Sequence, residues 1–498
     1  MKSFRIQIIT LLLISTAMMS IVSCKKFLEE DPKNQVTITN FYKTESDAIA
    51  AVNAIYAYLN SVDNFAVGGN TAGVYHSTFW VMMGLASDEM LNNQLGAANF
   101  DQISSFSHTP QNPSIEEIWG MDYKTITLAN IAIARIPGIE MNATLRNRLV
   151  GEAKFLRGLM YFNLVRIFGQ VPLLIEENNP LLPEKATVDA IYAQIEQDLS
   201  DASGVLPLSY DPGSGRGRAT SGAANAILSK VYLTRENWEQ ASIYAKKVID
   251  SEQYELWQDF ADVFKLSSRG GKEAIFSVGF GDAGGAIVFW EVGQFNVRLL
   301  PAALSAEGIQ NAQGWQFPTE YLYNQFDVDD RRREVTFITE INGANGPFTI
   351  RPYVKKYWDR QMEPQGNNSS NDFPVIRYAD VLLIYAEAQN ELGNSQTAHD
   401  YINEVRKRAR FDGTNYANAL PDYAGLNQEL FRDAVLKERS MELVFEGQRW
   451  FDLARTGKLE QRVPLAKPGV TPAPRNYLFP LPQREVDLNP NLGQNEGY

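Results

Sequence analysis

Apolar residues recur at helical spacing along most of the chain, so the hydrophobic pattern predicts a mainly α protein. Thr44 is a candidate N-cap with Asp47 three positions later, and apolar residues then follow at intervals of three and four. The same spacing predicts helices over 76–90, 115–136, 145–168, 187–203, 220–235, 238–250, 378–393, 396–410 and 427–455. Short polar connections between these segments favour a scaffold of paired helices.

Two of the predicted helix pairs are copies of one unit. Residues 228–249 and 385–406 each contain a helix, a short polar turn and a second helix, and Gly393 supplies the turn of the second copy. The matching positions are Ala241 and Ala398, Tyr244 and Tyr401, and Val248 and Val405. A small residue near the start of the second helix is typical of tetratricopeptide repeats, so we expect an alpha-alpha superhelix of stacked pairs.

Residues 270–377 depart from the helical pattern. Residues 273–280 (EAIFSVGF) and 335–341 (VTFITEI) have the composition of short strands, and Gly, Asn and Gln are frequent between them. A long irregular insertion of this kind is typical of a functional loop region. We therefore expect one domain over 41–498. The helical scaffold would comprise residues 41–269 and 378–460. The loop-rich ligand region would lie between them, at about 270–377.

The amino terminus has the pattern of an export signal. Lys2 and Arg5 precede an uncharged apolar run of the kind that forms the centre of a signal peptide. A small residue stands just before Cys24, the only cysteine of the chain, and this junction resembles a lipobox. We expect residues 1–23 to be removed, Cys24 to be acylated, and residues 24–40 to form a polar tether. An ordinary signal peptide followed by a buried cysteine is the alternative.

Composition and charge exclude some classes of protein. The chain is 44% hydrophobic and 21% charged, as in globular proteins, and its net charge of −13 argues against nucleic acid as a partner. After the signal, no apolar run approaches the roughly 18 residues that a membrane span needs. We therefore expect the lipid alone to hold the protein on a membrane.

The usual signatures of catalysis are missing from the sequence. It contains no Walker loop, dinucleotide fingerprint, HExxH motif or GxSxG elbow, and its three histidines lie far apart. Glu438, Glu442 and Glu446 could act as paired carboxylates, but a helix whose charges pair with one another and with its neighbours is favoured. Residues 327–333 do not fit a calcium loop and are better explained by a capped helix end. We predict no enzyme, no cofactor and no metal site.

The chemistry most typical of ligand binding lies in residues 286–318. This run mixes aromatic residues with amides, and Asn296 and Arg298 belong to it. Flat rings such as Trp290 and Trp315 can cover the C–H face of a sugar, while amides exchange hydrogen bonds with its hydroxyls. A peptide ligand could also exchange hydrogen bonds with these amides and pack against these rings. The alternative is that these aromatic residues belong to the core and the amides form turns.

A second candidate is the loop that begins at residue 91. Asn92, Asn93 and Gln94 place three amides in succession, which suits hydrogen bonding to hydroxyls and equally suits a solvated turn. We include these amides with Trp290, Trp315, Asn296 and Arg298 as candidate ligand-binding residues.

Several blocks of the sequence resemble the SusD/RagB family of outer-membrane lipoproteins. Cys24 followed by FLEEDP is one, and ERSMELVFEGQRWFDLARTGK is the most specific. The others are FLRGLMYFNLVRIFGQVPLL, YADVLLIYAEAQNELG and the closing YLFPLPQREVDLNPNLGQNEGY. These blocks span the chain from Cys24 to Tyr498.

The resemblance implies a non-catalytic protein with tetratricopeptide-like helix pairs and a ligand site on irregular loops. Family members are anchored by lipid on the outer face of the outer membrane. They cap a SusC-like TonB-dependent transporter and pass oligosaccharides or peptides to it. By position, the segments 91–99 and 289–315 match the regions that bear ligand residues in the family. A peptide ligand, a helical glycosidase and a pure protein–protein scaffold are the alternatives, and the identity of the ligand stays open.

Overall fold

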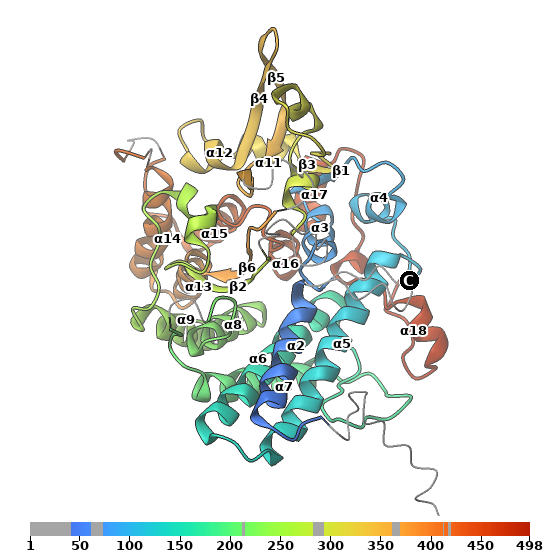
Figure 1. The fold of residues 1–498 in the computed structure, drawn as a ribbon. Helices are drawn as coiled ribbons and strands as arrows, with labels where there is room; N and C mark the ends of the chain where they lie inside the picture. Colours follow the sequence, from blue (N-terminus) through green and yellow to red (C-terminus); the bar gives the residue numbers. More distant parts are fainter. Residues whose placement is uncertain are drawn as a thin grey trace, which may run out of the picture.

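Helices dominate the fold (Figure 1). The structure is a computed structural model that describes residues 41–60, 73–211, 215–281, 293–360, 369–411, 413–416 and 420–498. The predicted signal, tether and acylated Cys24 lie outside these residues, as does Trp290. Within the described part of the chain, no helix is both long and apolar enough to cross a bilayer.

The first half of the chain forms a set of packed helices. They are α2 (Glu45–Asn60), α3 (Thr78–Leu85), α4 (Ala98–Ser104), α5 (Pro113–Arg135), α6 (Ala143–Phe168) and α7 (Val188–Val205). Helices α5, α6 and α7 pack one after another, and α2 packs against α5 and α6. The predicted cap of the first helix is confirmed, because Thr44 Oγ1 accepts from Asp47 N at 3.2 Å and Asp47 Oδ2 accepts from Thr44 N at 2.8 Å. The helix predicted over 76–90 is shorter, since the Ser87 hydroxyl donates to Gly84 O and accepts from Glu89 N.

The two predicted repeats form the expected helix pairs. Their helices are α8 (Ser221–Thr234) with α9 (Trp238–Asp250), and α13 (Tyr378–Glu391) with α14 (Ser395–Ala409). Ala241 and Ala398 are fully buried, which allows the paired helices to approach closely. Gly393 adopts φ 82° in the turn of the second pair, as a left-handed helix end requires. Helix α13 also packs against α9, so the pairs stack, and the predicted tetratricopeptide-like scaffold is confirmed.

The segment between the repeats carries most of the strands. Three antiparallel pairs join β1 (Met90–Asn92) to β3 (Gln316–Pro318), β2 (Ala274–Val278) to β6 (Phe373–Arg377), and β4 (Phe337–Gly343) to β5 (Gly346–Val354). Short helices α10 (Phe295–Leu299), α11 (Glu320–Gln325) and α12 (Arg331–Thr336) lie among them. Asp330 caps α12 as predicted. The β4–β5 hairpin projects from the body above α11 and α12 (Figure 1).

The prediction of one helix over 427–455 is wrong. The segment forms α15 (Gln428–Glu442) and α16 (Arg449–Arg455), and the remaining helices are α17 (Leu459–Ala466) and α18 (Gln483–Leu488). Phe445 and Gly447 adopt positive φ values of 58° and 69° between α15 and α16. The Phe445 amide donates to the buried carboxylate of Glu89, far away in the sequence. This hydrogen bond joins residues that are far apart in the sequence, so no local pattern predicts the interruption between α15 and α16.

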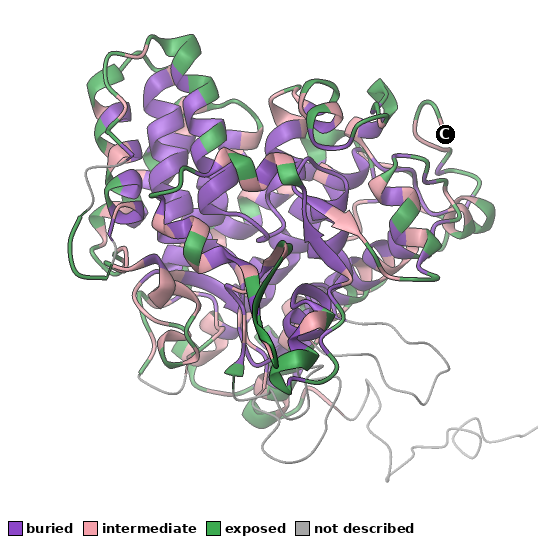
Figure 2. Cartoon of the chain, turned by 90° about the horizontal axis from the view of Figure 1, so that it is seen from above, coloured by how far each residue is buried: buried purple, intermediate pink, exposed green. Residues whose placement is uncertain are grey.

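A continuous apolar core runs through the helical body. Figure 2 shows buried residues along the inner faces of the helices and exposed residues on their outer faces. Trp450 and Phe451 of α16 belong to this core. A smaller cluster that includes Leu304 and Ile341 lies under the β4–β5 hairpin. This cluster joins parts of the loop-rich segment to one another. Other side chains of the same segment pack into the main core, namely Phe295, Phe337 and Tyr357.

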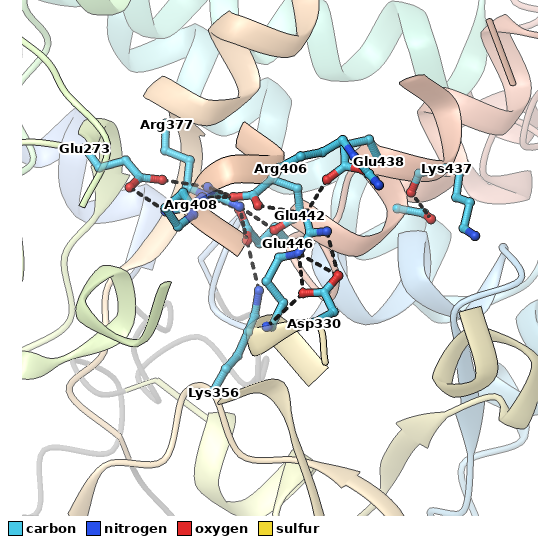
Figure 3. A network of polar contacts seen from close by, with 12 residues as sticks. Glu273, Asp330, Lys356, Arg377, Arg406, Arg408, Lys437, Glu438, Glu442 and Glu446 are labelled. Carbon is cyan, nitrogen blue, oxygen red and sulfur yellow. Dashed lines mark hydrogen bonds and ion pairs between the residues drawn. The ribbon is translucent and has the colours of Figure 1, made fainter. Parts of the chain in front are cut away.

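A buried network of ion pairs links α15 to the segments around it. Glu438 pairs with Arg332 and Arg406, each at 2.7 Å. Glu442 pairs with Arg377 at 2.5 Å and also with Arg408 and Arg332. Figure 3 shows Arg377, Arg406 and Arg408 converging on Glu438 and Glu442 of α15. The charged helix is locked against its neighbours as predicted. The predicted pairing of charges along the helix itself is not seen among the described residues, because the glutamates pair with arginines of other elements.

Candidate functional site

Two candidate segments that lie far apart in the sequence meet at the β1–β3 strand pair. Asn92 stands opposite Gln316, and the side-chain amide of Gln316 donates to Asn92 Oδ1 at 3.0 Å. The backbone amide of Asn93 donates to the Trp315 carbonyl at 2.6 Å. The pairing therefore sets the amide loop beside the aromatic segment.

Arg298 of α10 connects the two segments further. Its Nε donates to Gln294 Oε1 at 2.7 Å. Its Nη1 lies 3.4 Å from Gln94 Oε1 and 3.3 Å from Gln316 Oε1. We define Asn92, Gln94, Gln294, Arg298, Trp315 and Gln316 as the Arg298 cluster.

Aromatic rings flank the guanidinium of Arg298. Its Cζ lies 5.2 Å from the ring centre of Trp315 and 5.6 Å from that of Phe100. Both distances are within the range of cation–π attraction. Phe100 is buried in α4, whereas Trp315 is half-buried and keeps part of its ring accessible.

Burial shapes the electrostatics of the cluster. Arg298 is 7% exposed. Burial lowers the pKa of Arg298 to about 10, and the negative charge of Glu117 opposes that shift. The guanidinium is therefore still protonated at neutral pH.

The other predicted site residues have separate environments. Asn92 donates to Asp101 at 2.7 Å, and Asn93 is exposed on the loop. Asn296 is 1% exposed, and its amide exchanges 3.0 Å hydrogen bonds with the backbone of Asp359. The structure thus places Asn92, Gln94, Arg298 and Trp315 together, while the Asn296 side chain fixes the backbone.

Sequence reasoning missed two members of this neighbourhood. Phe100 has the spacing of an ordinary core residue in a short helix, and no local signal links it to Arg298. Gln316 is fully buried, and its role depends on the register of the β1–β3 pair. Gln294 precedes Arg298 by four residues, so helical spacing alone could suggest their contact. The other members of the cluster are not related to Arg298 by such a spacing.

The candidate acid and base groups of α15 serve the fold. Burial alone would raise the pKa of Glu442, but the guanidinium groups of Arg408, Arg377 and Arg332 outweigh it and hold the value at about 2. A carboxylate of this kind does not exchange protons near neutral pH. Among the described residues, no group of three or more His, Cys, Asp or Glu side chains could hold a metal ion.

A hollow that shares no lining residue with the Arg298 cluster lies beside β2. Its volume is about 470 Å³, and its lining includes Arg216, Tyr254, Lys272, Phe276 and Asp372. It is large enough for a sugar unit and combines polar groups with aromatic ones. The sequence analysis did not select these residues.

Helix pairs that support a loop-borne surface of amides, aromatic rings and one cation define a helical-repeat binding protein. Two family models match the chain: the SusD family over residues 315–498, and a family described as starch-binding and associating with the outer membrane over residues 26–233. The chain belongs to the SusD family, because a SusD-like protein of Formosa agariphila is 30% identical over the full length of both chains.

Other relatives agree with this assignment. The starch-binding protein SusD of Bacteroides thetaiotaomicron is 24% identical over 86% of each chain. A solved structure described as a laminarin-binding SusD-like protein is 27% identical, with a TM-score of 0.77. That match covers 92% of this chain and all of the other.

Proposed function

We propose that this chain is a cell-surface lipoprotein that captures oligosaccharides with the Arg298 cluster and passes them to a SusC-like TonB-dependent transporter. The observation that carries the proposal is the β1–β3 pairing, which sets amides, a half-buried tryptophan and a cation on one surface. Trp315 would pack against the C–H face of a sugar, and Asn92 and Gln94 would bond to its hydroxyls. The names of the starch-binding and laminarin-binding relatives support a glycan.

Isothermal titration against a panel of neutral and acidic glycans tests the ligand class. Trp315→Ala should weaken binding by about 0.5–1.5 kcal/mol beyond the loss of buried area. The matched control is Trp257→Ala, because Trp257 is also half-buried and has a cation, Lys272, 4.9 Å from its ring. Unchanged affinity in Trp315→Ala would remove Trp315 from the site. A loss confined to Trp257→Ala would point to the cavity that Trp257 lines, away from the Arg298 cluster.

Peptide capture is the second candidate function, because amides and aromatic rings also suit a peptide backbone. Titration of a mixed peptide library in the same experiment separates the two ligand classes. A helical glycosidase would instead need two carboxylates about 5–10 Å apart across a cleft. Recovery of the bound oligosaccharide intact after long incubation would support a binding role without catalysis.

Membrane attachment is tested at Cys24. We propose that the mature chain begins at an acylated Cys24, with residues 24–40 as the tether to one domain over 41–498. Cys24→Ala should move the protein from the membrane fraction to the soluble fraction. Mass spectrometry of the mature amino terminus should show the acyl groups in the native protein, and an unmodified cysteine would contradict the anchor. Copurification with a large barrel protein from native outer membranes tests delivery to a transporter.

A further inference from the structure

The guanidinium of Arg298 is buried among neutral groups. Its hydrogen-bond acceptors are the amide oxygens of Gln294, Gln94 and Gln316, and the two bonds from Nη1 are long. Among the described residues, none accepts a hydrogen bond from its Nη2, and no carboxylate forms an ion pair with it. Within the part of the chain that the structure describes, the Nη2 side of the guanidinium fork therefore has no acceptor.

Arg298 differs from the other arginines that are almost completely removed from solvent in the described segments, because each of those forms an ion pair with an aspartate or a glutamate. The pairs are Arg157 with Asp198, Arg332 with Asp330, Arg377 with Glu273, Arg406 with Glu438, Arg408 with Glu442, Arg439 with Asp380, and Arg449 with Asp88. Arg166, which is more exposed, also lacks an ion pair among the described residues, and it donates to Phe162 O and Asn163 Oδ1.

A buried cation without an anion is costly, and neutral amides compensate for it only in part. Glu117 contributes a favourable charge from a distance without forming an ion pair with Arg298. Aromatic rings beside the guanidinium add attraction but do not neutralise it. The site would gain from a ligand that brings its own negative charge.

We propose that the captured oligosaccharide is acidic, and that Arg298 binds its carboxylate or sulfate ester while Trp315 packs against the sugar ring. This inference rests on the proposed function of the Arg298 cluster. A guanidinium offers paired donors in a planar fork that matches a carboxylate or a sulfate group. The chain carries a net charge of −13, so its surface does not attract polyanions in general. Selectivity for an acidic glycan therefore depends on a local cation such as Arg298.

Titration with three probes of similar length tests the inference: an oligogalacturonate, a sulfated carrageenan oligosaccharide and neutral laminarihexaose. We expect at least one acidic probe to bind about tenfold more tightly than laminarihexaose, equivalent to about 1.4 kcal/mol. The probe that does so identifies the group as a carboxylate or a sulfate. Arg298→Gln should abolish the preference. Arg298→Lys should keep part of it, because the charge remains and the fork is lost.

Arg166→Gln is the matched control. Arg166 lies in α6, where burial also lowers its pKa to about 10 and its Cζ is 3.8 Å from the ring centre of Phe162. This variant should keep the preference for the acidic probe, and thermal melts of all variants report their folding. Equal or tighter binding of laminarihexaose would overturn the inference, as would a preference that survives Arg298→Gln.

The titrations distinguish a wrong prediction of an acidic ligand from a wrong prediction of glycan binding. If laminarihexaose binds best and Trp315→Ala weakens it, the glycan site stands and the acidic ligand is rejected. If no probe binds and an acidic peptide does, both the glycan proposal and the acidic-glycan inference are rejected.

Discussion

Buried charged residues in the described part of the chain differ in the partners that surround them. The carboxylates of α15 are saturated by arginines, as Glu442 shows by its contacts with Arg332, Arg377 and Arg408. Arg298 contacts only neutral acceptors among the described residues. Spacing along one helix predicts that charges will pair, but it does not tell which distant element brings the partner.

Glu442→Gln should destabilise the protein by about 3–5 kcal/mol, because it removes the carboxylate that these three buried guanidinium groups share and leaves an excess positive charge in the buried network. Chemical denaturation with urea measures the change in the free energy of unfolding. Glu334→Gln is the control, since its carboxylate is 73% exposed and pairs with Arg331 at the surface. That variant should change stability by less than about 1 kcal/mol. Equal effects of the two substitutions would contradict a structural role for the buried network.

Lys467 should make stability depend on pH. Burial lowers the pKa of Lys467 to about 7, opposed by Asp88, whereas the unfolded chain has the ordinary value of 10.5. The folded state therefore loses this proton at a lower pH than the unfolded state. The stability of the wild type relative to Lys467→Met should rise as pH increases from about 7 to 10.5. Urea titrations of both proteins across this pH range measure the difference in their free energies of unfolding. A difference that does not change with pH would contradict the lowered pKa of Lys467.

At the scale of elements, the spacing of apolar residues predicts the helices well, because the apolar face of each helix comes from one continuous stretch of sequence. The caps at Thr44 and Asp330 and the turn at Gly393 are likewise local features. The break between α15 and α16 escaped prediction because the partner of Phe445 is Glu89, from a different part of the chain. The strand pair β1–β3 escaped for the same reason, and it is the pair that assembles the candidate site.

Gly169→Ala tests how the end of α6 is formed. Gly169 adopts φ 72° and ψ −119°, and an added Cβ would lie 2.9 Å from Leu478 Cδ1. The substitution should cost roughly 1–3 kcal/mol of backbone strain, with steric overlap in addition. Gly457→Ala is the control, because it has φ 65° with nothing within 4 Å of an added Cβ. Thermal unfolding should show a larger loss for Gly169→Ala, and equal losses would contradict the close contact with Leu478.

At the scale of the whole molecule, the helical-repeat class followed from the sequence, while the assembly of the site did not. Composition and aromatic content selected the segments at 91–99 and 289–315, but only the fold shows that Trp315 and Arg298 lie together while the Asn296 side chain is occupied elsewhere. The scaffold brings loops from distant parts of the chain together at the candidate site.

The central claim is that this surface holds the glycan. A crystal structure of the protein with the tightest-binding glycan of the panel tests it most directly. We predict a sugar ring against Trp315, with hydroxyls near Asn92 and Gln94 and an anionic group at Arg298. A glycan bound instead in the hollow lined by Arg216 and Tyr254, with the Arg298 cluster empty, would contradict the account.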